Sequence, residues 1–99
     1  TLRLEHRFPG ADTNPYLAMA ALIAATLNGI TYQRDPGPPA VGDADAQQDL
    51  ARPPSSLGDA IAAFERSSFG PDFLGADVAS HYAAHARLEW RSSLAAVTD

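Results

Sequence analysis

The stretch RLEHRFPGADTNPYL, residues 3–17, carries the strongest structural signals in this sequence. From Leu2 to Phe8, apolar and charged side chains alternate with a period of two, interrupted at His6, which is typical of a β-strand. Farther along, Asn14 is a favourable helix N-cap and Pro15 is a favourable first helical residue. The stretch therefore predicts a strand that leads into a helix.

The predicted strand would place three charged side chains on one face, about 7 Å apart in steps of two residues. These side chains are Arg3, Glu5 and Arg7. A carboxylate between two guanidiniums suits phosphoryl chemistry, because the carboxylate can bind Mg²⁺ or Mn²⁺ and the guanidiniums can hold phosphate oxygens. Alternating charge is also common on the solvent face of an ordinary strand, and from the spacing alone we favour that interpretation.

The helix that follows is expected to be buried on all sides. Residues 16–27 contain no charge, large apolar side chains point in every direction around the axis, and Asn28-Gly29 is a favourable stop. A chain of 99 residues can hardly surround such a helix, and it offers the strand no obvious partner. We therefore expect residues 1–99 to be an incomplete part of a larger domain, beginning mid-protein or after processing because the first residue is Thr1.

Two more helices are predicted after a loop of more than twenty residues, Thr31 to Pro54, which has the length of a functional or disordered segment. Ser56 and Asp59 resemble a capping box, and they precede a helix with one apolar face. The Phe69-Gly70-Pro71 segment breaks the chain. The last helix is expected to run from about Asp72 or Ala76 to near Val97, with an apolar face of Ala79, Tyr82, Ala83, Ala86, Trp90, Leu94 and Val97.

Composition excludes several functional classes. The net charge of −5 argues against a nucleic-acid surface, since phosphate binding requires clustered cations. The chain has no cysteine for disulfides or thiolate metal sites. Its longest apolar run is too short to cross a bilayer, and no cleavable leader precedes that run. We expect a cytoplasmic protein that binds neither nucleic acid nor membrane.

Other polar residues have simpler interpretations. His6 should face away from its charged neighbours, as a buried structural histidine. His81, His85 and Glu89 share one stripe of the last helix; two histidines at this spacing can bind Zn²⁺, but we favour a solvated polar face. Tyr82 and Trp90 are expected in the core. A solvated loop is expected to contain Asp43, Asp45 and Asp49, which lack the pattern of a calcium loop.

Residues 3–17 resemble the R-x-E-x-R … N-P-Y-L segment of the glutamine synthetase family. The resemblance continues at residues 20–30, 35–39, 56–57 and 82–99, so it covers nearly the whole chain. It implies that residues 1–99 are the C-terminal part of an α+β glutamine-synthetase-like catalytic domain. This part would be mainly α, with three helices and one N-terminal strand.

The resemblance also implies roles for the charged residues. Glu5 matches the family's metal-binding glutamate, Arg3 matches an arginine that contacts the nucleotide phosphates, and Arg7 matches an arginine at the substrate carboxylate and the transferred phosphoryl. The family uses ATP and Mg²⁺ or Mn²⁺ to phosphorylate glutamate, and ammonia or another amine then displaces phosphate. Its other site residues lie upstream, and its sites form between neighbouring subunits of a ring-shaped homo-oligomer. The chain alone should therefore be inactive.

The local sequence indicates a branch within the family. Residues 3–7, RLEHR, followed by Gly10-Ala11-Asp12, resemble the γ-glutamyl-polyamine synthetase branch more than ammonia-using glutamine synthetases. The loop near Asp43 lacks the tyrosine at which some bacterial glutamine synthetases are adenylylated. Two alternatives stay open: a glutamine synthetase that uses ammonia, and a truncated, non-catalytic binding or assembly module of the same fold.

Overall fold

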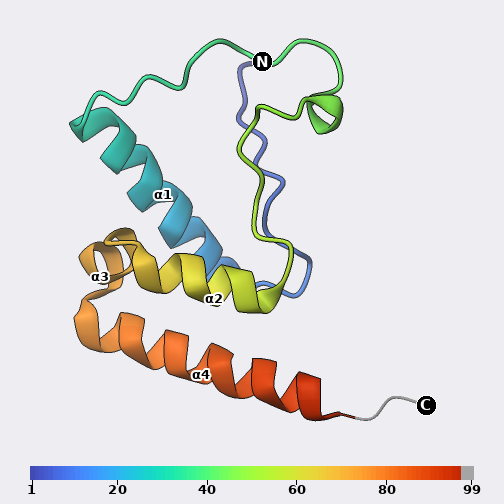
Figure 1. Ribbon diagram of the computed structural model, residues 1–99. Helices are drawn as coiled ribbons and strands as arrows, with labels where there is room; N and C mark the ends of the chain where they lie inside the picture. The colour runs from blue at the N-terminus through green and yellow to red at the C-terminus, as the bar shows by residue number, and fades with distance from the viewer. Residues whose placement is uncertain (97–99) are drawn as a thin grey trace. The chain divides into compact units, whose positions relative to one another are not determined.

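The computed structural model describes residues 1–96, and the regular secondary structure of this part of the chain is helical (Figure 1). Its elements are α1 (Pro15–Thr31), the 3₁₀ helix η1 (Ala44–Ala46), α2 (Leu57–Arg66), α3 (Phe69–Leu74) and α4 (Ala76–Ala95). The chain divides into two compact units. The first comprises residues 1–51 with α1 and η1, and the second begins at Arg52 and contains α2, α3 and α4.

The N-terminal strand predicted from the alternating pattern is wrong. Residues 1–8 are exposed and lack regular secondary structure, and no strand occurs within the described range 1–96. A strand is stable only when a neighbour completes its backbone hydrogen bonds, and the alternation of side chains supplies no such neighbour. The fold class of three helices and one strand is therefore replaced by four α-helices.

The predicted start of α1 is confirmed by its cap. The side-chain oxygen of Asn14 accepts hydrogen bonds from the backbone N–H groups of Tyr16, at 3.0 Å, and Leu17, at 3.3 Å. Pro15 occupies the first helical position, where its missing N–H costs nothing. Two backbone donors that the helix itself cannot satisfy are thus paired by one side chain.

The predicted stop at Asn28-Gly29 is wrong, because α1 continues to Thr31. The left-handed residue that ends the helix is Gln33, with a φ of 48°. This turn lets the backbone N–H of Arg34 donate to the carbonyl of Gly29 at 3.0 Å. The Arg34 side chain reinforces the same end, since its Nε donates to Oδ1 of Asn28 at 2.8 Å.

Burial of α1 on all sides is not found in this chain. No residue of α1 is buried. Large apolar side chains along its whole length are exposed, from 84% for Tyr16 to 56% for Ile23. The helix therefore presents a continuous apolar surface of the kind that proteins normally cover.

In the second unit, the predicted N-cap Ser56 at the start of α2 is confirmed, although Asp59 bonds to the Ser56 hydroxyl and not to its backbone N–H as in a full capping box. The Ser56 hydroxyl accepts from the backbone N–H of Asp59 at 3.1 Å and donates to the Asp59 carboxylate at 2.8 Å. The chain break predicted around Pro71 contains a further short helix, α3, in whose first turn a proline is tolerated. Gly75, with a φ of 83°, separates α3 from α4, so the last helix begins at Ala76.

The core of the second unit lies where α2 and α3 pack on α4. Its buried apolar residues are Ile61, Ala79 and Ala83. Glycines bring large rings close: a Cβ at Gly58 would lie 3.1 Å from the Trp90 indole, and one at Gly70 would lie 2.8 Å from the Phe64 ring. Small residues therefore set how closely these helices approach.

The apolar face predicted for α4 is only partly in the core. Trp90 is half-buried, as expected for a residue that packs on α2. Tyr82 is 42% exposed and Leu94 is 66% exposed, so the prediction of Tyr82 as a core residue is wrong. Val97 and the rest of the predicted helix end lie outside the described residues.

The cap of α2 leads to a stability prediction with a built-in control. We expect Ser56→Ala to lower the free energy of unfolding of the second unit by about 1 kcal/mol, because the Asp59 N–H loses its acceptor. Ser55→Ala is the control, since the Ser55 hydroxyl donates to the same carboxylate at 3.2 Å but caps no backbone group. Its effect should stay within about 0.5 kcal/mol. Urea unfolding followed by circular dichroism measures both values, and equal losses would contradict the capping role.

Candidate functional site

The three charged residues singled out in the sequence lie on the exposed segment that precedes α1. Arg3, Glu5 and Arg7 are all exposed. Nε of Arg7 lies 3.2 Å from Oε1 of Glu5, and the two side chains are 86% and 67% exposed. The structure thus brings Glu5 and Arg7 together. Water screens a pair this exposed, so the pair contributes little to stability.

The chemistry of these residues suits phosphate and metal binding. Glu5 can supply carboxylate oxygens to a hard dication, and the two arginines can hold anionic oxygens in a fixed fork. Mg²⁺ requires about six oxygen ligands in near-octahedral geometry. Within residues 1–96, no group of three or more His, Cys, Asp or Glu side chains could hold a metal ion. Glu5 alone could supply only one or two of these ligands, and the others would have to come from phosphates, water or further protein residues.

The remaining polar candidates are solvent-exposed. His6 is exposed, with its ring 5.4 Å from the Phe8 ring, so the prediction of a buried histidine is wrong. His81, His85 and Glu89 are exposed, as expected for a solvated face. The loop carboxylates Asp43, Asp45 and Asp49 are exposed as well, and Asp43 accepts from the Asp45 N–H at 3.0 Å as the cap of η1.

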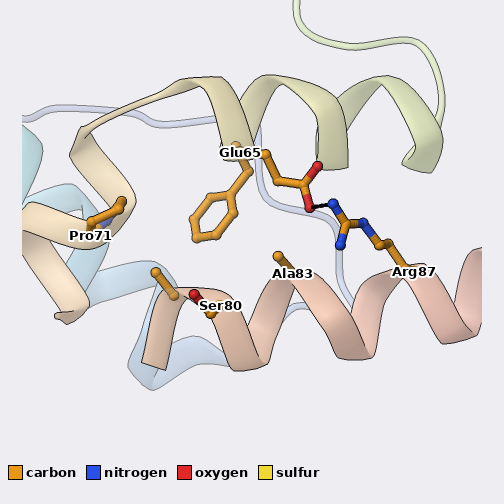
Figure 2. Close-up of a pocket in the computed structure, with 7 residues that line it drawn as sticks. Glu65, Pro71, Ser80, Ala83 and Arg87 are labelled. Atoms are coloured by element: carbon orange, nitrogen blue, oxygen red, sulfur yellow. Dashed lines mark ion pairs between the residues drawn. The ribbon is translucent and has the colours of Figure 1, made fainter. Parts of the chain in front are cut away.

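The second unit contains a groove that no pattern in the sequence predicted, and Figure 2 shows it in close-up. It has a volume of about 350 Å³ and is lined by Phe64, Glu65, Pro71, Ala79, Ser80, Ala83 and Arg87. The carboxylate of Glu65 on α2 forms an ion pair with the guanidinium of Arg87 on α4 across it (Figure 2). No pattern in the sequence links these two residues, because their contact depends on how the helices pack. No polar or charged side chain among the described residues is buried, so the groove holds no enclosed catalytic group.

No helix in the described part of the chain has the length and apolar character required to span a membrane.

Comparison with known proteins gives a match along the whole chain. The family described as "Glutamine synthetase, catalytic domain" matches residues 1–99. No solved structure shows a significant match.

Similar proteins include ligases that are named for different acceptors. A gamma-glutamylethanolamide synthetase from Streptomyces coelicolor is 41% identical over 99 residues, which is 100% of this chain and 21% of the relative. A glutamate–isopropylamine ligase from Pseudomonas sp. is 40% identical over 82% of this chain and 18% of the relative. A glutamine synthetase from Rhizobium leguminosarum is 38% identical over 91% of this chain and 22% of the relative. The chain thus spans about a fifth of the length of these relatives.

Proposed function

Because the chain belongs to the glutamine synthetase family, we propose that it is the C-terminal part of an ATP-dependent ligase that joins glutamate to an amine. The match over residues 1–99 is the observation that carries this proposal. The names of the similar proteins support it, since each is a glutamine synthetase or joins an amine to glutamate. The whole protein would work in the cytoplasm as a ring-shaped homo-oligomer.

The proposed reaction has two steps. An oxygen of the glutamate side-chain carboxylate attacks the γ-phosphorus of ATP, so that a new O–P bond forms, the bond to the β-phosphate oxygen breaks, and ADP leaves. The nitrogen of the amine then attacks the carbonyl carbon of γ-glutamyl phosphate. A C–N bond forms, the C–O bond to phosphate breaks, and the nitrogen loses a proton to give the amide.

Each step needs positive charge beside phosphoryl oxygens, which the charged segment before α1 can supply. We assign Glu5 to the divalent metal, Arg3 to the nucleotide phosphates, and Arg7 to the glutamate carboxylate and the transferred phosphoryl. Bound Mg²⁺ or Mn²⁺ would offset the charge on the phosphates. The 3.2 Å distance between Arg7 Nε and Glu5 Oε1 supports this assignment, because a phosphoryl group and its metal ion would need both side chains close together.

We further propose that the acceptor is an organic amine. Identities of 41%, 40% and 38% are too similar to choose between an amine and ammonia. The preference for an organic amine rests instead on the amino-acid sequence of residues 3–7 and 10–12, which resembles the γ-glutamyl-polyamine branch. The similarity to the Rhizobium glutamine synthetase keeps ammonia as the second candidate.

We expect residues 1–99 alone to release no phosphate from ATP in the presence of Mg²⁺, glutamate and an amine. Among residues 1–96, no group of three or more side chains could hold a metal ion, and Arg3, Glu5 and Arg7 are all exposed to water. A colorimetric phosphate assay on the purified chain tests this, with the full-length protein as the positive control. Turnover by the chain alone would contradict the proposal that its site is incomplete.

In the full-length protein, we expect Glu5→Gln to lower kcat by roughly 100- to 1000-fold and to raise the Mg²⁺ concentration needed for half-maximal rate, because the metal loses an anionic ligand. Asp49→Asn removes one negative charge from an exposed loop position outside the proposed metal site and is the control. Steady-state phosphate release at varied Mg²⁺ measures both effects. Unchanged metal dependence in Glu5→Gln would remove Glu5 from the site.

The amine is tested by supplying the full-length protein with ATP, Mg²⁺, glutamate and one acceptor at a time. We expect phosphate release with putrescine, spermidine or ethanolamine, and little with ammonia. Release with ammonia alone would instead assign a glutamine synthetase. Mass spectrometry of the product separates amide formation from simple ATP hydrolysis.

A further inference from the structure

Two of the three histidines in the chain lie one turn apart on the exposed side of α4. His81 and His85 occupy positions i and i+4 of this helix, and both side chains are exposed. At about 100° per residue, they lie on the opposite side of the helix from Ala79 and Ala83, which are buried. Neither histidine lines the groove between α2, α3 and α4, so packing within the second unit leaves both imidazoles accessible.

This spacing suits one metal ion held by two imidazoles. Side chains at i and i+4 have Cβ atoms roughly 5–6 Å apart on one face. Metal–nitrogen bonds of about 2.0–2.1 Å can therefore be made from both rings to one ion. Because the helix holds the second imidazole near the first, the second bond forms within the molecule and adds affinity without a new encounter.

Neighbouring charges favour a cation on the same stripe. Asp77 lies one turn before His81, Glu89 lies one turn after His85, and both carboxylates are exposed. They add negative potential and can accept hydrogen bonds from the imidazole N–H groups that face away from a metal. The described residues form no group of three or more ligands, so water would complete the coordination. Two nitrogens with water suit Ni²⁺, Cu²⁺ or Zn²⁺, whereas Mg²⁺ and Ca²⁺ prefer oxygen ligands.

We propose that His81 and His85 form a bidentate binding site for a divalent transition-metal ion of the Ni²⁺, Cu²⁺ and Zn²⁺ class on the exposed side of α4. This site uses none of the residues assigned to the ligase reaction and does not depend on that reaction. Its role is to bind the metal, and it needs no other chain to do so.

The chain contains its own control. His6 is also exposed, but it lies in an irregular segment and has no second histidine near it in the sequence, so no helix holds another imidazole beside it. A second control moves one histidine without changing the number of histidines. His85→Ala combined with Leu88→His leaves two histidines on α4 but separates them by about two turns, which is roughly 10 Å and too far for one ion. Leu88 is 61% exposed and tolerates the change.

The test is titration of residues 1–99 with NiCl₂ by calorimetry, in excess Mg²⁺ so that oxygen sites are occupied. We expect one Ni²⁺ per wild-type chain. His81→Ala and His85→Ala should each weaken binding by roughly tenfold or more, because the chelate is lost. His6→Ala should bind as wild type does, and the variant with the moved histidine should bind as weakly as His85→Ala.

Helix stability gives a second readout, because an ion that joins two turns must stabilise the helix between them. Ni²⁺ should raise the thermal midpoint of the wild-type circular dichroism signal but leave that of His85→Ala unchanged. Equal Ni²⁺ affinity in wild type and both single variants would overturn the proposal. So would an equal loss in His6→Ala, or wild-type affinity in the variant with the moved histidine.

Discussion

Close approach of α4 to α2 and α3 is the constraint on which the second unit depends. The contact residues are small: Ala79 and Ala83 are buried on α4, and Gly58 and Gly70 face large rings with no side chain of their own. Dispersion contacts are individually weak and lose strength within an ångström of separation, so the packing requires these helix surfaces to meet closely. The Trp90 indole fills the space that Gly58 leaves open.

The first unit is determined by local interactions instead. Asn14 caps the start of α1, and the left-handed Gln33 with the Arg34–Asn28 hydrogen bond ends it. These contacts fix the limits of the helix but bury none of its residues. A helix can thus be well defined at both ends while its apolar surface is still uncovered. The exposed segment with Glu5 and Arg7 precedes this helix, and the Asn14 cap fixes the point at which that segment ends and α1 begins.

Most predictions succeeded or failed according to the distance over which the feature is determined. The stop of α1 is an exception, because Asn28-Gly29 is a local signal but the helix continues to Thr31 and turns at Gln33. The caps at Asn14 and Ser56 depend on residues two or three positions away, and both were predicted correctly. The N-terminal strand depends on a distant partner, and the burial of His6 and Tyr82 depends on what surrounds them; these predictions were wrong. For the site, the family could be recognised from residues 3–17, whereas the roles of the charged residues stay predictions. The Glu65–Arg87 ion pair had no signal in the sequence, because helix packing alone creates it.

The order of elements in the second unit bears on how fast it can fold. Its helices follow one another closely: Ser67 and Ser68 connect α2 to α3, and Gly75 alone connects α3 to α4 (Figure 1). Contacts between consecutive helices close short loops and cost little chain entropy, and proteins dominated by such contacts fold in microseconds to milliseconds. The contact of α3 with α4 therefore closes a short loop, whereas the contact of α2 with α4, as between Gly58 and Trp90, spans more of the chain and has the larger entropy cost.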